Sequence, residues 1–181
     1  MGNSKEKQLK NGLFYMLPVI VGNALPILTL PIFTRILSVE EFGVFALSQV
    51  YAIFVNGISN FGLTIGYERN FYESEEKLKR AGLLFSTLAF VISTFLFFAV
   101  FTFIFKGPIA QLIIGSEKYN HIIFWSYCST GMTSLKAYYL IYLKNTENAK
   151  AYVWYTIDEN LIGVALSLFM VAFLKIGVMR F

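Results

Sequence analysis

The residues best suited to hold a ligand are a lysine, two adjacent carboxylates and three amides, all set within or beside apolar segments. They are Lys136, Asp158, Glu159, Asn23, Asn56 and Asn60. A cation among apolar residues suits an anionic group such as a phosphate, and amide side chains hydrogen-bond to polar head groups. A pair of membrane carboxylates can bind a coupling proton or a sodium ion, or pair with Lys136.

Each of these residues also has a purely structural explanation. Lys136 lies seven residues before Leu143, about 10 Å along a helix, so its stem can extend toward the headgroups. Asn56 and Asn60 are four residues apart and share one helix face, where they can join two helices. Asp158 and Glu159 can lie at the membrane surface if the last helix begins later than its hydropathy suggests.

The sequence offers little for covalent or metal chemistry. With one cysteine, Cys128, and one histidine, His121, it can form neither an internal disulfide nor a His/Cys metal cluster. Phosphate-binding-loop, zinc-protease and serine-hydrolase motifs do not occur. The basic residues form no continuous stripe. We therefore expect a protein that is not an enzyme, has no cofactor or metal, and does not bind nucleic acid.

The composition places these residues in a membrane protein. Of the 181 residues, 56% are hydrophobic and only 14% are charged, and the mean hydropathy is +0.60. Soluble domains carry about 25% charged residues, which they need to cover their surface. An ordinary soluble enzyme is therefore excluded.

Five stretches are long and apolar enough to span a bilayer, which takes about 20 residues. They cover residues 12–34, 42–66, 81–105, 121–143 and 154–174. We predict an all-α, multi-pass bundle over residues 1–181. Lysine and arginine favour cytoplasmic loops. With the N-terminus inside, nine of these residues lie in inner segments and five in outer ones, so we expect a cytoplasmic N-terminus.

Three local patterns refine this picture. Pro18, Pro26 and Pro31 interrupt the hydrogen bonds of the first segment, which then either bends for packing or turns free carbonyls, with Asn23, toward a transport path. Ser38 and Glu41 form a capping box that begins the second helix. Gly62 and Gly66 match the spacing that lets two membrane helices approach closely.

The region from Asn23 to Arg69 resembles the N-terminal part of bacterial polysaccharide exporters, the flippases of O-antigen and capsule lipid-oligosaccharides. These proteins are related to multidrug-and-toxin-extrusion transporters. The resemblance rests on one run, P-x-x-T-R-x-L-S-x-E-E-F-G, and on isolated matches around it. The matching positions are Asn23, Pro26, residues 31–43, residues 60–63 and Arg69.

This resemblance implies two helical bundles around a central cavity, and the chain would form an incomplete first bundle. It implies a bacterial inner-membrane protein that flips undecaprenyl-pyrophosphate-linked oligosaccharide for cell-surface polysaccharides such as O-antigen, capsule and lipopolysaccharide. Lys136 would then contact the head group, Asn23, Asn56 and Asn60 would line the cavity, and Asp158 and Glu159 would couple an ion. The partners would be the lipid-linked oligosaccharide, membrane lipids, and a polysaccharide polymerase or glycosyltransferases.

Two alternatives remain open. A cation-coupled drug exporter of the same superfamily would use a buried acid and gain nothing from Lys136. A non-transporting scaffold would bind glycosyltransferases through the basic segment 69–80. Because the sequence shows five spans and no second half, we expect a truncated chain or a part of a longer transporter.

Overall fold

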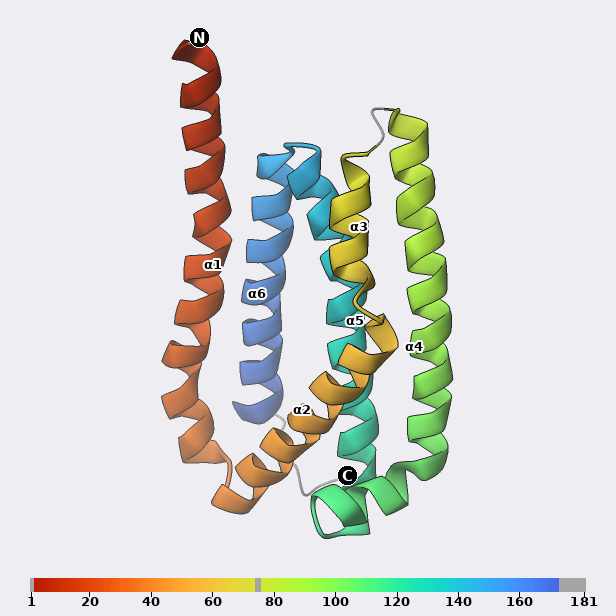
Figure 1. The fold of residues 1–181 in the computed structure, drawn as a ribbon. Coiled ribbons are helices and arrows are strands. Elements are labelled where there is room, and N and C mark those ends of the chain that lie inside the picture. Colours follow the sequence, from red (N-terminus) through yellow and green to blue (C-terminus); the bar gives the residue numbers. More distant parts are fainter. Residues whose placement is uncertain (1, 74–75, 173–181) are drawn as a thin grey trace. The chain divides into compact units, whose positions relative to one another are not determined.

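The computed structural model describes residues 2–73 and 76–172, with the side chains of residues 12–73, 76 and 78–165. Six α-helices and one short 3-10 helix make up this part of the chain, and it contains no strand (Figure 1). The helices are α1 (Gly2–Ile36), α2 (Val39–Asn60), α3 (Leu63–Phe71), α4 (Lys77–Ile113), η1 (Glu117–Tyr119), α5 (Asn120–Asn145) and α6 (Ala149–Ala172). The predicted all-α class is confirmed.

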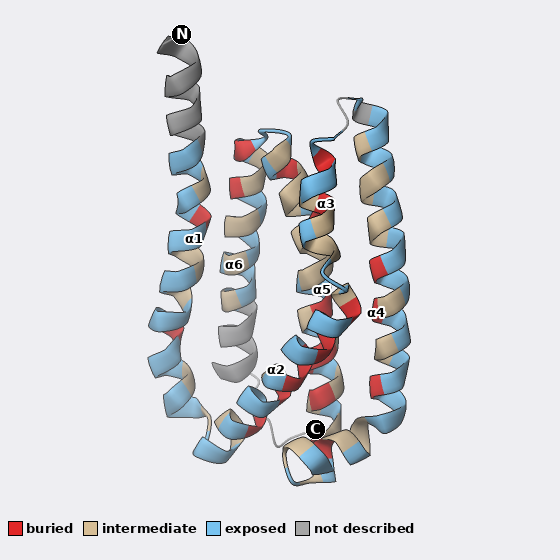
Figure 2. Cartoon of the chain, in the orientation of Figure 1, coloured by how far each residue is buried: buried red, intermediate tan, exposed pale blue. Residues whose placement is uncertain are grey.

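Three of these helices are long and apolar enough to cross a membrane within the described residues. They cover Gly12–Ile36, Val39–Asn60 and Leu78–Ile113. Many residues along them are exposed, pale blue in Figure 2, and these include large apolar side chains that lipid would solvate. The predicted spans 121–143 and 154–174 coincide with α5 and α6. Residues 173 and 174 lie outside the described part, and membrane crossing by α5 and α6 stays a prediction.

The second predicted span is divided in the structure. The stretch 42–66 is interrupted after Asn60, where Phe61 has φ 49° and Gly62 has φ 68°, and α3 begins at Leu63. Backbone with positive φ cannot continue a right-handed helix, and only glycine adopts it at little cost. Hydropathy alone missed this break because the residues on both sides are apolar.

The structure agrees with the predicted start of the second helix but not with the predicted helix contact at Gly62 and Gly66. α2 begins at Val39, directly after Ser38, as the capping box predicts. The spacing of Gly62 and Gly66 does not mark a close helix contact, because a Cβ at either position would meet nothing within 4 Å. Gly62 is instead required by the turn between α2 and α3.

α1 remains one helix through Pro18, Pro26 and Pro31. Two threonines follow the last two prolines at a fixed spacing of three residues. The Thr29 hydroxyl donates to the carbonyls of Leu25 (3.0 Å) and Pro26 (3.3 Å), and Thr34 repeats this pattern four and three residues back. These hydrogen bonds satisfy the threonine hydroxyls inside an apolar helix, where water cannot.

α4 has 37 residues and is longer than a bilayer requires. At 1.5 Å per residue it extends roughly 55 Å, against a hydrocarbon core of about 30 Å. Figure 1 shows α4 bending near its C-terminal end, the part that contains Pro108. Proline lacks the N–H that the preceding turn would use, which accounts for a bend there.

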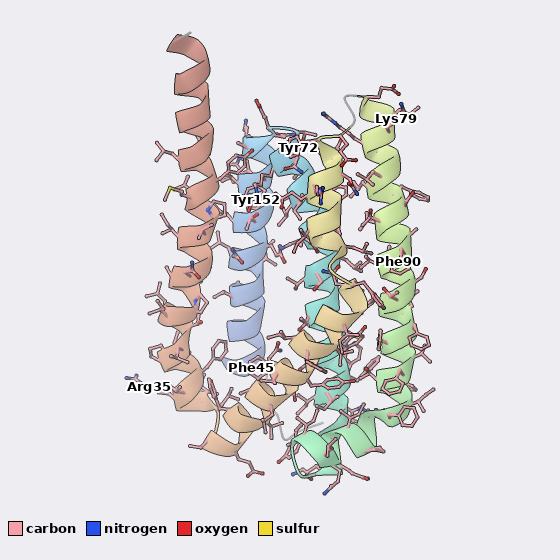
Figure 3. All side chains as sticks on the ribbon, viewed as in Figure 1. Arg35, Phe45, Tyr72, Lys79, Phe90 and Tyr152 are labelled. Carbon is pink, nitrogen blue, oxygen red and sulfur yellow. The ribbon has the colours of Figure 1, made fainter. Side chains whose placement is uncertain are left out.

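The chain falls into two compact units, and each has its own packing. Of the described residues, 2–39 and 143–172 form one unit, with α1 and α6, and 40–73 and 76–142 form the other, with α2, α3, α4, η1 and most of α5. In the first unit the rings of Tyr15 and Tyr152 meet edge-to-face at 5.2 Å, and Gly22 brings the α1 backbone close to Asn160. Figure 3 labels Tyr152 on α6.

The second unit has two apolar clusters. The first joins α2, α4 and α5, and the second joins α3, α4 and α5. Their buried members are Tyr51, Val55, Phe95, Ala110, Ile123 and Tyr127 in the first cluster and Tyr67, Phe71, Val91 and Tyr138 in the second. Four of these ten residues are tyrosines with hydroxyls to satisfy, so this core is partly polar.

Candidate functional site

The buried face of α5 is a stripe of residues three or four positions apart. It consists of Tyr127, Gly131, Leu135, Tyr138 and Tyr142, which contribute to the clusters described above or pack against them. Residues at this spacing share one side of a helix. The stripe holds α5 against α2, α3 and α4, and it defines which side of α5 is left for a ligand.

Lys136 lies on the other side of α5. It follows Tyr127 by nine residues, which at 3.6 residues per turn is about half a rotation away. Thr133 and Tyr139, three residues on either side of it, share this face and are exposed. The Lys136 side chain is half-buried. The structure thus keeps this cation out of the packed core of its unit.

Asn56 is buried in contact with the stripe. Its amide Nδ2 donates to the carbonyl of Ala52 at 2.8 Å on its own helix and to the carbonyl of Tyr127 at 3.3 Å on α5. The Tyr127 hydroxyl in turn donates to the carbonyl of Phe95 on α4, at 3.0 Å. Asn56 therefore joins two helices through a chain of hydrogen bonds, the structural role that its position on α2 allowed.

Asn60 lies at the break between α2 and α3. Its Oδ1 accepts a hydrogen bond from the Tyr138 hydroxyl, and its Nδ2 donates to Thr64 Oγ1 at 2.8 Å. Thr94 of α4 donates to the carbonyl of Ser59 at 2.9 Å, beside the same break. The bond to Ser59 satisfies a backbone carbonyl that a continuous helix would have used internally, and the other two tie the Asn60 side chain to α3 and α5. A role of Asn56 or Asn60 in binding substrate stays a prediction.

Asp158 and Glu159 lie on α6, in the other unit, and both are exposed. The residues of α6 that contact α1 include Tyr152 and, eight positions later, Asn160. Asp158 lies six residues after Tyr152, about a third of a turn from it and on the side away from Asn160, whereas Glu159, seven residues after Tyr152, lies close to the Tyr152 side of the helix. The two carboxylates line a concave space of about 530 Å³, together with Trp154, Tyr155, Ile162 and Gly163.

The remaining predicted residue, Asn23, lies on α1 next to Gly22 and is exposed. The structure thus brings Asn56 and Asn60 into one hydrogen-bonded region on α2. It places Lys136 on the opposite side of α5 from that region, and it places Asn23, Asp158 and Glu159 in the other unit. A metal site is not evident, since the described residues contain no group of three His, Cys, Asp or Glu side chains.

Several residues important to these sites were missed by the sequence reasoning. Tyr127 and Tyr138 supply hydroxyls to the helix contacts, and Gly131 allows them to form. Gly131 follows Tyr127 by four residues and precedes Tyr138 by seven, a spacing that places all three on one face of a helix and is visible in the sequence. Trp154 and Tyr155 were not among the predicted site residues, yet they lie beside the α6 carboxylates.

Comparison with known families identifies the chain. The model of the polysaccharide biosynthesis protein family matches residues 8–179. The chain belongs to this family. The resemblance drawn from the motif in residues 31–43 is thereby confirmed, and a membrane protein of polysaccharide biosynthesis agrees with the three apolar helices. Comparison with curated proteins and with solved structures gives no match.

Proposed function

We propose that this protein takes part in flipping an undecaprenyl-pyrophosphate-linked oligosaccharide across the bacterial inner membrane, for surface polysaccharides such as O-antigen or capsule. The observation that carries the proposal is the family match over residues 8–179 of a chain with three apolar, membrane-length helices. The N-terminus would lie in the cytoplasm, supported by the excess of basic residues in the segments that this orientation places inside.

The physical task is to move a polar head group through hydrocarbon without forming or breaking a covalent bond. Each unpaired hydroxyl or amide of the sugar costs several kcal/mol to remove from water. A helix face with polar side chains lowers that cost while the lipid tail stays in the bilayer. Alternating access between helical bundles would then expose this face to one side at a time.

Lys136 is our candidate for contact with the pyrophosphate. Its place on the face of α5 opposite the packed stripe, beside Thr133 and Tyr139, leaves a cation and two hydroxyls on one surface. Charge-assisted hydrogen bonds from a lysine to phosphate oxygens are about twice as strong as neutral ones. A head group that carries two phosphates would therefore be held here during transfer.

The test is translocation by the purified full chain in proteoliposomes that contain a lipid-linked oligosaccharide. A membrane-impermeant lectin added outside reports the glycan that reaches the outer leaflet. We expect translocation by the unmodified chain and a loss of about tenfold in rate for Lys136→Ala, equal to about 1.4 kcal/mol of barrier. Lys136→Arg should retain most of the rate.

The matched control is Lys79→Ala, which removes an exposed lysine that pairs with Glu76 at 2.9 Å. It should translocate normally. Absence of translocation by the unmodified chain would overturn the proposed function. Equal rates for Lys136→Ala and Lys79→Ala would remove Lys136 from the head-group site.

One observation favours a second candidate, a cation-coupled exporter. The carboxylates of Asp158 and Glu159 beside Trp154 and Tyr155 would suit an organic cation. This candidate predicts efflux of a dye cation that depends on a sodium or proton gradient, from proteoliposomes in which no lipid-linked glycan is flipped.

A further inference from the structure

Part of the surface of α6 combines aromatic rings with carboxylates. Trp154 and Tyr155 are 59% and 57% exposed, and Asp158 and Glu159 follow each of them by one helical turn. A segment in which large rings and acids are exposed together is poorly suited to lipid, since acids in a membrane helix face protein or a polar cavity. These side chains are therefore better suited to a polar ligand than to hydrocarbon.

The geometry of the face is two parallel columns along the helix. One column is Trp154, Asp158 and Ile162, and the other is Tyr155, Glu159 and Gly163. Successive members are four residues apart, about 6 Å along the axis. Each ring thus lies about one sugar-ring length from a carboxylate.

The end of the second column is open. A Cβ built on Gly163 would meet nothing within 4 Å, so the absence of a side chain leaves space next to Ile162. The concave space beside these columns measures about 530 Å³. Small-molecule sites commonly measure about 300–1,000 Å³, so this space is large enough for a sugar unit.

The side chains that line this space favour a positively charged ligand over a negatively charged one. Indole and phenol rings attract a cation to their faces and offer flat apolar surfaces. Carboxylates accept charge-assisted hydrogen bonds from ammonium groups and repel other carboxylates. Among the described residues that line this space, two are acidic and none is basic. An acidic sugar would therefore be disfavoured here.

We propose that this face of α6 binds a sugar unit that carries a free amino group. A ring of Trp154 or Tyr155 covers the apolar face of the sugar, and the ammonium group lies between the Asp158 and Glu159 carboxylates. The inference rests on the proposed function, because it names the class of glycan that the transported lipid carries. It also gives the two acids a role different from binding a coupling ion.

The test uses the purified full chain in lipid nanodiscs and isothermal titration calorimetry with three soluble glycans. The probes are a glucosamine tetramer, the fully N-acetylated tetramer, which has the same backbone without the charge, and a galacturonate tetramer. We expect the glucosamine tetramer to bind at least tenfold more tightly than the N-acetylated one. We expect the galacturonate tetramer to bind most weakly, and the amine preference to decrease between 50 mM and 500 mM salt, as for exposed charges.

Four variants locate the binding. Asp158→Asn and Glu159→Gln keep the shape of the side chain, and each should reduce the amine preference at least threefold. Gly163→Leu fills the open space and should weaken all glycan binding. Glu117→Gln, which removes an exposed carboxylate in the other unit, is the matched control and should bind like the unmodified chain.

Equal affinity for the amino and N-acetylated tetramers, or tighter binding of the galacturonate, would overturn the inference without any reference to the variants. An unchanged preference in both Asp158→Asn and Glu159→Gln would also overturn it. Tighter binding of tetraphenylphosphonium than of the glucosamine tetramer would assign the face to organic cations. Flipping of lipid-linked glycans without amine preference refutes this inference alone, whereas amine-selective binding without flipping refutes the proposed function alone.

Discussion

At Gly131 the backbone of α5 lies very close to side chains of α4 and α2, so this position gives a sharp test of the packing. A Cβ at this position would overlap the ring of Phe95 on α4 and would lie 3.0 Å from the Asn56 Oδ1 atom on α2. The Phe95 ring cannot simply move away, because it is buried and stacked on Tyr127 with centroids 5.3 Å apart. Gly131→Ala therefore forces a shift in a packed core.

The expected cost follows from three contributions. Overpacking a core costs about 1–3 kcal/mol, and a disturbed aromatic pair about 0.5–1.5 kcal/mol. Alanine is more favourable than glycine inside a helix by about 1 kcal/mol, which offsets part of this. We expect Gly131→Ala to lower the free energy of unfolding by roughly 0.5–3.5 kcal/mol.

The measurement is unfolding in mixed micelles by titration with sodium dodecyl sulfate, followed by circular dichroism. Gly66→Ala is the matched control, because its Cβ would meet nothing within 4 Å, and it should be neutral or slightly stabilising. In a Phe95→Leu background the cost of Gly131→Ala should fall by about 1 kcal/mol, since the overlapping ring is gone. The reasoning is refuted if Gly131→Ala is as stable as Gly66→Ala, or if its cost is the same in both backgrounds.

Two further hydrogen bonds can be tested by removing a tyrosine hydroxyl. Tyr138 is fully buried and donates to Asn60, so Tyr138→Phe should lower the free energy of unfolding by about 1–3 kcal/mol. The same titration measures it, and a loss no larger than that of Tyr139→Phe, at a partly exposed position, would contradict the assignment. The Tyr119 hydroxyl donates to Glu40 Oε1 at 2.8 Å, and this hydrogen bond raises the pKa of Tyr119 above its usual value of 10. The stability that Tyr119→Phe removes should therefore be complete below pH 10 and decline as the pH rises through the raised pKa. A difference between the two proteins that stays constant from pH 8 to the highest accessible pH would disprove this account.

The prediction about Tyr119 also explains part of the family motif. Glu40 belongs to the run in residues 31–43 that carried the resemblance, and its carboxylate holds Tyr119 at the junction between α4 and α5. Its neighbour in the motif, Ser38, precedes the first residue of α2. The motif therefore combines a local helix start with a contact to a segment about 80 residues away.

Properties that depend on composition or on short-range order could be predicted from the sequence. A long apolar segment must become a helix in a membrane, because each backbone N–H and C=O needs a partner that lipid cannot provide. For that reason the predicted all-α class agrees with the structure. The helix start after Ser38 also agrees, because it depends on residues that are adjacent in the sequence. The family could be inferred because its motif is contiguous.

Tertiary structure decided what depends on contacts between segments. Next to the break at Phe61 and Gly62, Tyr138 donates a hydrogen bond to the Asn60 side chain and Thr94 donates one to the Ser59 carbonyl. Both donors lie on other helices. Likewise, only the packing of α1 against α6 shows that Tyr152 and Asn160 are in contact with α1 while Asp158 and Glu159 stay exposed. Helical periodicity defines the faces of a helix, but which face is covered is settled by the partner that packs against it.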